Sequence, residues 1–165
     1  PPYVVLVRDL RAALVSNYEK WKERYGVTFK EYLRGDPRGR RYIFDLWGGL
    51  HFLNRWARVR RRFPARTLVL RYEDLQAAPV VGLAQVFEHF GVRVARAHLE
   101  AAAAAGSKSA MARLLDPASP VTNIIRDDDR PPAAWFDAED RAWFDAARRA
   151  CLADDFGYDW RWPDE

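Results

Sequence analysis

The stretch VVLVRDLRAALVS, from Val4 to Ser16, carries the strongest fold signal in this chain. The apolar run Val4–Val7 is typical of a short strand that is buried on both faces of a parallel sheet. After Arg8, the segment Leu10–Val15 is apolar on most sides and has a helical pattern, which continues past Ser16. The stretch therefore predicts a strand followed by a helix, with a cation at the end of the strand and a hydroxyl two turns into the helix.

A second β-rich run, Thr67–Arg71, has the same character as Tyr3–Val7. A long helical pattern separates the two runs, as in a crossover between parallel strands. The chain is therefore predicted to be an α/β protein with a parallel sheet.

The rest of the chain is helix-rich. Thr28 followed by Glu31 is a capping box, a good signal for the start of a helix. We expect helices over residues 10–25, 28–33, 41–62, 80–90, 96–105, 108–115 and 138–152. Two strands are too few to organise so many helices, so we expect further strands upstream of Pro1 in a single domain of which residues 1–165 are a part. The end of the chain, with Phe156, Tyr158 and Trp160, is expected to pack back on this domain.

Composition places limits on the class of protein. The 49% hydrophobic content supplies one ordinary core, and no apolar run is long enough to cross a membrane. Of the 27 Lys and Arg residues only four are Lys, and Arg is favoured where phosphate or carboxylate is bound, although a GC-rich genome accounts for the bias equally well. The single Cys151 excludes an internal disulfide, so we expect a cytoplasmic protein with Cys151 as a small core residue.

The end of the first strand is the first candidate for a binding site. In open α/β sheets, ligands bind beyond the carboxyl ends of the strands. Arg8 either binds an anion there or pairs with a carboxylate such as Asp9 or Glu73. Ser16 either bonds back to the carbonyl four residues earlier or contacts a ligand.

Three segments together resemble one enzyme family. VVLVRDLRAALVS resembles the 3′-phosphate-binding segment of sulfotransferases that use 3′-phosphoadenosine 5′-phosphosulfate (PAPS). LVLRYEDLQAAP, Leu68–Pro79, is similar to the second block of that family, a strand followed by Tyr-Glu-Asp and a helix. GSKSAM, Gly106–Met111, is similar to its adenine-contacting segment. The three segments come in the family's order and extend over most of the chain.

The resemblance implies roles for particular residues. Arg8 and Ser16 would bind the 3′-phosphate, and Tyr72 would contact the adenine or its neighbourhood. Ser107 would line the adenine pocket, together with Lys108, which stands where the family has an aromatic residue.

A further cofactor contact is implied near the C-terminus, in the run IIRDDDRPPAAW. Arg126 and Trp135 match in position the Arg and Trp between which the family has Lys and Gly. Here Asp127 and Asp128 replace the Lys and Gly and would repel a phosphate that they faced. Arg130 is the substitute candidate for this contact.

The resemblance also implies a fold and a reaction. The fold would be a three-layer α/β/α sandwich like that of P-loop NTPases, truncated at the N-terminus. The reaction would transfer a sulfuryl group from PAPS, without a metal, to a hydroxyl or amine of a small-molecule, glycan or lipid acceptor. The family's phosphosulfate loop, its Lys and its base precede the position of Pro1. We therefore name no catalytic residue, and we expect residues 1–165 alone to be inactive. The three histidines are interpreted as surface or structural residues on helices: His51, His89 and His98.

Two other function classes stay open. The basic run Arg55–Phe63 suggests a noncatalytic module that docks on acidic partners, and the expected fold also suits a P-loop kinase-like phosphotransferase. In the basic run, Phe52, Trp56, Val59 and Phe63 would form an inward apolar stripe with arginines on the solvated face. With the aromatic residues inward, no nucleic-acid binding is expected. Retention on immobilised adenosine 3′,5′-bisphosphate would separate the sulfotransferase from both alternatives.

Overall fold

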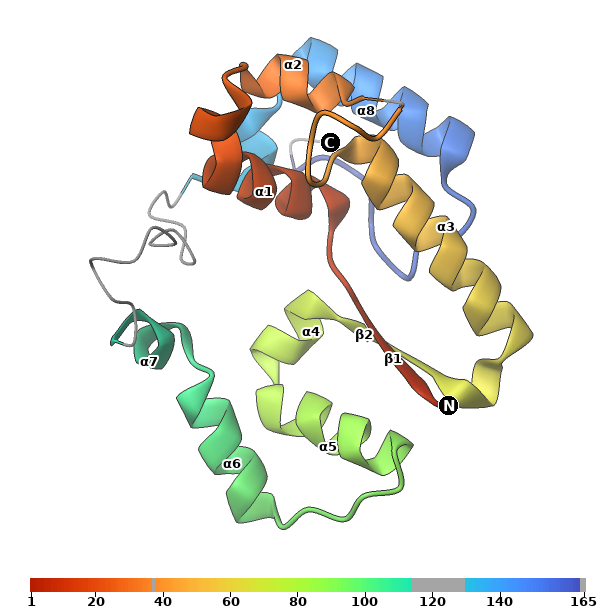
Figure 1. Ribbon diagram of the computed structural model, residues 1–165, viewed down its shortest axis with the longest axis vertical. Coiled ribbons are helices and arrows are strands. Elements are labelled where there is room, and N and C mark those ends of the chain that lie inside the picture. Colours follow the sequence, from red (N-terminus) through yellow and green to blue (C-terminus); the bar gives the residue numbers. More distant parts are fainter. Residues whose placement is uncertain (37, 114–129, 164–165) are drawn as a thin grey trace. The chain divides into compact units, whose positions relative to one another are not determined.

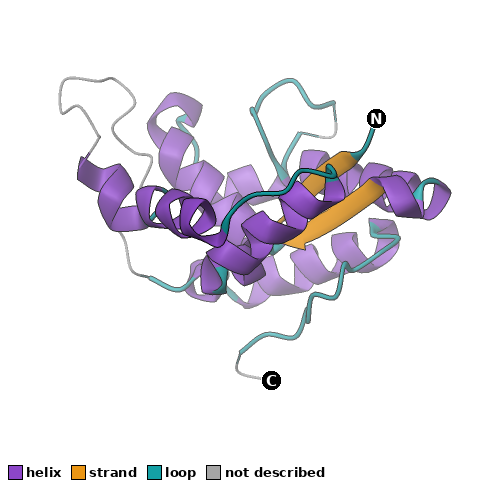
Figure 2. Ribbon diagram, turned by 90° about the horizontal axis from the view of Figure 1, so that it is seen from below, coloured by secondary structure: helices purple, strands orange, loops and turns teal. Residues whose placement is uncertain are grey.

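A small parallel sheet is present where the sequence predicts it (Figures 1 and 2). The computed structural model describes residues 1–36, 38–113 and 130–163. Strand β1 (Tyr3–Val7) pairs in parallel with β2 (Thr67–Arg71), in a register that joins Val7 to Arg71. Both predicted strands are confirmed, and so is the α/β class, with helices making up most of the described structure.

The described chain divides into two compact units. Unit 1 comprises residues 1–8 and 59–127, and unit 2 comprises residues 9–58 and 128–165. Besides the sheet, unit 1 contains η1 (Pro64–Arg66), α4 (Tyr72–Ala77), α5 (Pro79–His89), α6 (Arg96–Ala105) and α7 (Lys108–Arg113). Unit 2 contains α1 (Leu10–Tyr25), α2 (Phe29–Arg34), η2 (Pro132–Trp135), α8 (Ala138–Cys151) and α3 (Leu46–Arg62) up to residue 58.

Local signals set the ends of α1. The Asp9 carboxylate accepts hydrogen bonds from the backbone N–H groups of Arg11 (2.8 Å) and Ala12 (3.4 Å), which satisfies amides that lack partners within the helix. Gly26 ends the helix with φ of +61°, a conformation that favours glycine, and its N–H donates to the Lys22 carbonyl. The predicted bounds of this helix are confirmed.

The capping box of α2 is also confirmed. Thr28 Oγ1 accepts from the Glu31 N–H at 3.3 Å, while the Glu31 carboxylate accepts from the Thr28 N–H at 2.8 Å. Hydrogen bonds from the Thr28 backbone N–H and hydroxyl to the Glu31 carboxylate lower the pKa of Glu31.

Helix α3 begins at Leu46, five residues later than predicted. The Asp36 carboxylate accepts hydrogen bonds from the backbone N–H groups of Arg38, Arg40 and Arg41, which holds these residues in a loop. The buried Asp45 side chain then accepts from the Gly48 N–H at 2.8 Å and starts the helix.

The apolar stripe predicted for α3 is wrong at Phe52 and Phe63, while Trp56 and Val59 between them are half-buried. Phe52 and Phe63 are 41% and 42% exposed. Smaller residues on another face of the helix are buried instead, namely Leu46, Gly49, Leu50, Leu53 and Ala57.

Aromatic side chains dominate the core of unit 2. Phe29 of α2 packs edge-on against Phe136, and Phe136 in turn contacts Trp162 with ring centroids 5.2 Å apart. Phe144 of α8, fully buried, contacts both Trp160 and Trp162. The prediction that the chain end packs on the body of the protein is confirmed.

Three smaller expectations need correction. The segment after β2 forms the helix α4, which is absent from the predicted helices, because Tyr72 to Ala77 continues from the strand without a breaker. Cys151 is exposed at the last position of α8, on the solvent side of the helix, and is not a core residue. The helix predicted over residues 108–115 is described as far as Arg113. Among the described helices, none has the length and apolar run needed to cross a bilayer.

Candidate functional site

Two predicted site residues meet at the carboxyl ends of the strands in unit 1. Arg8 follows Val7 in β1, and Tyr72 follows Arg71 in β2; because Val7 and Arg71 are paired, their successors are neighbours. The Arg8 guanidinium carbon lies over the Tyr72 ring, 4.7 Å from its centroid. Such a cation–π contact helps to hold the guanidinium in place.

One hydrogen-bond donor of the Arg8 guanidinium has no acceptor. Its Nε is buried and has no hydrogen-bond partner in the described chain. The expected alternative is a pair of Arg8 with Glu73 or Asp9. Asp9, the other carboxylate considered, is bonded to Arg11, with Nη2 and Oδ2 2.6 Å apart. A buried donor without an acceptor is costly, and an anionic ligand is one way to satisfy it.

The neighbouring strand-end arginine is engaged differently. Arg71 Nε lies 3.7 Å from Asp74 Oδ2, an i,i+3 pair that joins the end of β2 to the first turn of α4. Asp74 is largely exposed, so this pair contributes little stability by itself.

Ser16 lies half-buried in the second turn of α1, in unit 2. Its hydroxyl makes no hydrogen bond to another described residue, so the bond back to the carbonyl four residues earlier, one of the two alternatives, is not formed. Ser16 lines neither of the two hollows described below.

Ser107 and Lys108 belong to the start of α7 in unit 1. Ser107 Oγ accepts from the Ala110 N–H at 3.2 Å and lies 3.3 Å from Ser109 Oγ, so its hydroxyl caps this helix. Lys108 is exposed. No described hydrogen bond or ion pair joins either residue to Arg8 or Tyr72.

The predicted contact at Arg126 lies outside the described residues, as do Asp127 and Asp128. Its substitute, Arg130, stacks on Trp135 with its guanidinium carbon 4.9 Å from the ring centroid, and it donates to the Ala134 carbonyl. In unit 2, therefore, Arg130 anchors the turn that precedes α8.

The histidines make no cluster of the kind that activates a nucleophile. His51 and His98 are exposed, and the His89 ring nitrogen lies 3.3 Å from the Arg66 carbonyl oxygen. Over residues 1–36, 38–113 and 130–163, no group of His, Cys, Asp and Glu side chains is arranged to hold a metal ion.

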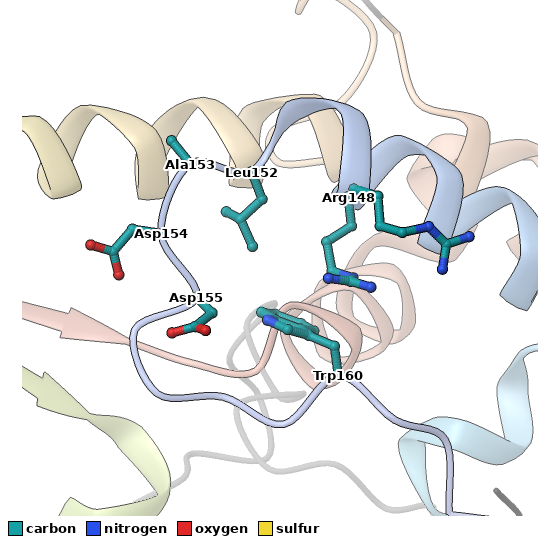
Figure 3. A pocket seen from close by; sticks show the side chains of 7 residues that line it. Arg148, Leu152, Ala153, Asp154, Asp155 and Trp160 are labelled. Atoms are coloured by element: carbon teal, nitrogen blue, oxygen red, sulfur yellow. The ribbon is translucent and has the colours of Figure 1, made fainter.

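A hollow of about 510 Å³ lies at the C-terminal end of α8 (Figure 3). Arg148 extends over the Trp160 ring, 5.5 Å from its centroid, and the Asp154 and Asp155 carboxylates lie on the opposite side of the hollow. The lining therefore has positive and negative side chains close together, and it includes none of the site residues predicted from the sequence.

A second hollow in unit 2, of about 340 Å³, is lined by arginine and tyrosine side chains and by one isoleucine: Arg24, Tyr25, Arg40, Arg41, Tyr42 and Ile43. The prediction of site residues missed this hollow. The signal that could have found it is the cluster of arginines around Gly39, in a segment whose Asp36 is typical of an Asx turn.

Comparisons of this chain with models of protein families, with curated proteins and with solved structures found no match.

Proposed function

We propose that this chain carries the 3′-phosphate-binding part of a PAPS-dependent sulfotransferase, with its small sheet belonging to a P-loop-like α/β/α sandwich. The observation that supports this best is the Arg8 side chain, whose buried Nε has no hydrogen-bond partner in the described chain while its guanidinium carbon lies over the Tyr72 ring. An oriented cation with a donor to spare, at the carboxyl end of a parallel strand, suits a phosphate.

The residue types fit a nucleotide with a terminal phosphate. Arg8 would donate a planar pair of N–H groups to phosphate oxygens, which a lysine cannot match. The Tyr72 ring covers one face of the guanidinium and reduces its access to water, which strengthens a charge-assisted hydrogen bond.

In the proposed reaction, the acceptor oxygen or nitrogen bonds to the sulfur of PAPS while the bond from sulfur to the 5′-phosphate oxygen breaks. Adenosine 3′,5′-bisphosphate leaves, and the acceptor loses a proton. The residues named here would bind the other end of the nucleotide. Their binding energy raises the rate only if groups at the sulfuryl centre use it to favour the transition state. Arg8 and Tyr72 are therefore assigned to positioning of the nucleotide, and no general base is assigned.

Nucleotide titration tests this assignment. Adenosine 3′,5′-bisphosphate should bind the chain measurably by calorimetry, and 5′-AMP, which lacks the 3′-phosphate, should bind much more weakly. Arg8→Ala should weaken binding of the bisphosphate by about 2–3 kcal/mol, the value of a charge-assisted pair, and should change the affinity for 5′-AMP little. Arg93→Ala, which removes an exposed arginine of the same unit, is the matched control and should leave both affinities unchanged.

Two results would overturn the proposal. The first is an absence of binding by adenosine 3′,5′-bisphosphate to a folded chain. The second is an equal loss of affinity for both nucleotides in Arg8→Ala, which would show that Arg8 does not distinguish the 3′-phosphate. Arg8→Lys keeps the charge without the planar fork, and a folded variant of this kind keeps the test valid if Arg8→Ala unfolds.

A further inference from the structure

The hollow lined by Arg24, Tyr25, Arg40, Arg41, Tyr42 and Ile43 combines positive charge with aromatic surface. Three of its lining residues are arginines, and none is a carboxylate. No described hydrogen bond or ion pair links the guanidinium of Arg24, Arg40 or Arg41 to an acidic side chain. Glu31 interacts electrostatically with Arg41, and Asp36 with Arg40, while the Asp36 carboxylate bonds to backbone N–H groups.

The loop that carries two of these arginines is held in place by its own backbone. The Asp36 carboxylate accepts from the N–H groups of Arg40 and Arg41, each at 3.1 Å, and the Gly39 N–H donates to the Asp36 carbonyl at 2.7 Å. Since Asp36 bonds to backbone amides, the guanidinium groups of the loop stay available. An ordered loop reduces the entropy cost of binding.

The tyrosine rings form a fixed wall of the hollow. Tyr42 packs edge-on against Tyr25 with ring centroids 5.0 Å apart, and Tyr25 stacks on Tyr32 at 5.6 Å. The Tyr25 hydroxyl is fully used, because it donates to Asn17 Oδ1 at 3.0 Å and accepts from the Ile43 N–H at 3.3 Å.

The Tyr42 hydroxyl differs from that of Tyr25. The Tyr42 residue is 8% exposed, and no described hydrogen bond involves its hydroxyl. Arg41 lies over the same ring, 5.3 Å from its centroid. Burial raises the pKa of Tyr42, so the hydroxyl stays protonated at neutral pH and can donate a hydrogen bond.

We propose that this hollow binds a small organic anion, in which a phosphate, sulfate or carboxylate group is attached to a flat apolar body. The anionic group would receive hydrogen bonds from Arg24, Arg40 and Arg41 and from the Tyr42 hydroxyl. The body would lie against the tyrosine rings and Ile43, which is 60% exposed and offers uncovered apolar surface. A volume of about 340 Å³ suits a ligand of one or two rings.

This inference is independent of the proposed nucleotide site. None of the lining residues is among those assigned to the nucleotide, and all of them belong to unit 2, whereas Arg8 and Tyr72 belong to unit 1. The two proposals can therefore fail separately.

Titration of the whole chain with phenyl phosphate tests the proposal, with inorganic phosphate and phenol as the two halves of the probe. Phenyl phosphate should bind saturably and at least about tenfold more tightly than either half, because charge and ring contribute together. Arg41→Gln should weaken phenyl phosphate about tenfold or more, and Tyr42→Phe should weaken it several-fold by removing one donor.

Arg38→Gln is the matched control. Arg38 is an exposed arginine of the same loop that does not line the hollow, and its substitution removes the same charge. Its affinity for phenyl phosphate should stay within about twofold of that of the unchanged chain, at moderate salt where distant charges are screened.

Three results would overturn the proposal. The first is an absence of saturable phenyl phosphate binding. The second is an equal loss of phenyl phosphate affinity in Arg38→Gln and Arg41→Gln. The third is an equal affinity of the unchanged chain for phenyl phosphate and inorganic phosphate. Circular dichroism establishes that each variant is folded. If Arg41→Gln unfolds, Arg40→Gln on the exposed part of the loop replaces it, with the same expected loss.

Discussion

Arg34 of α2 donates a 2.9 Å hydrogen bond from Nη1 to Oδ1 of Asp140 in α8, and the Asp140 side chain is only 4% exposed. Arg34 also reaches the exposed Glu139 from Nη2, at 3.0 Å. One guanidinium thus joins two helices of unit 2 through a buried and an exposed carboxylate. Because the two carboxylates differ in burial, their removal should lower the free energy of unfolding by different amounts.

Asp140→Ala should destabilise the protein by about 1–3 kcal/mol, because it leaves Arg34 partly buried without its better partner. Glu139→Ala, in the same helix turn, should cost below about 1 kcal/mol, since solvent screens the exposed pair. The free energy of unfolding, measured by urea denaturation, checks both values. Equal losses in the two variants would show that burial of Asp140 does not matter.

Two adjacent glycines of α3 should respond oppositely to alanine. A Cβ at Gly49 would lie 2.4 Å from Leu10 Cδ1 and 3.0 Å from Phe44 Cζ, inside a packed region. A Cβ at Gly48 would have Asp45 Oδ1 at 3.4 Å as its nearest neighbour, on an exposed face. Gly49→Ala should therefore destabilise by about 1–3 kcal/mol through overpacking, whereas Gly48→Ala should stabilise by about 0.5–1 kcal/mol through helix propensity.

Thermal unfolding of the two glycine variants under identical conditions provides the measurement. The melting temperature should fall for Gly49→Ala and rise for Gly48→Ala. A rise for both would mean that Leu10 moves aside without cost, contrary to the packing seen here.

Asp159 should titrate at unusually low pH. Hydrogen bonds from the Arg161 side chain and backbone N–H lower the pKa of Asp159 from 3.8 to about 2. Because the folded-state pKa is depressed, this pair contributes stability above pH 3.8, and that contribution is lost as the pH falls from there through about 2. Carboxyl-carbon NMR titration should show the low value directly.

Arg161→Gln should return the pKa of Asp159 most of the way to 3.8, since the Arg161 side chain is the largest cause of the shift. Arg149→Gln is the control, as it removes another exposed arginine that makes no described contact with Asp159. An unshifted Asp159 in the unchanged chain would contradict the geometry of this pair.

Elements governed by neighbouring residues could be predicted from the sequence. The apolar run of β1, the Asp9 cap and the terminal Gly26 are local signals, and the bounds of β1 and α1 agree with the structure. The Thr28 capping box gave the start of α2 for the same reason. Each of these signals acts within a few residues and does not need the tertiary fold.

The start and buried face of α3 could not be predicted in that way. The Asp36 carboxylate takes three backbone amides that a helix would otherwise use, and propensities of single residues do not reveal such a competition. The aromatic residues Phe52 and Phe63 suggested the wrong buried face, because the true one is made of smaller residues such as Gly49 and Ala57.

The candidate sites show the same contrast. Arg8 and Tyr72 come together because they follow paired residues of two predicted strands, so their contact follows from the sheet register. The hollow at Arg24 and Arg41 depends on the packing of Tyr25 on Tyr42, residues that are far apart in sequence. Tertiary packing of this kind leaves no periodic signal.

Arg11 should hold the C-terminal segment in place through the shape of its side chain as well as its charge. Only 11% of this side chain is exposed. Its Nη1 donates to the Arg161 carbonyl at 2.8 Å and its Nη2 to the Asp159 carbonyl at 2.9 Å, while the guanidinium lies 5.2 Å from the Trp162 ring centroid. A lysine offers one compact ammonium and can neither reach both carbonyls nor stack as a plane.

Arg11→Lys should therefore destabilise the protein by about 2 kcal/mol, nearly as much as Arg11→Met, although it keeps the charge. Hydrogen exchange should become faster at residues 156–162 in both variants, because the segment loses its anchor. Arg161→Gln, which changes a side chain that is 80% exposed, should leave this exchange nearly unchanged. Full stability of Arg11→Lys would show that positive charge alone is sufficient, and that the planar hydrogen bonds to the chain end are dispensable.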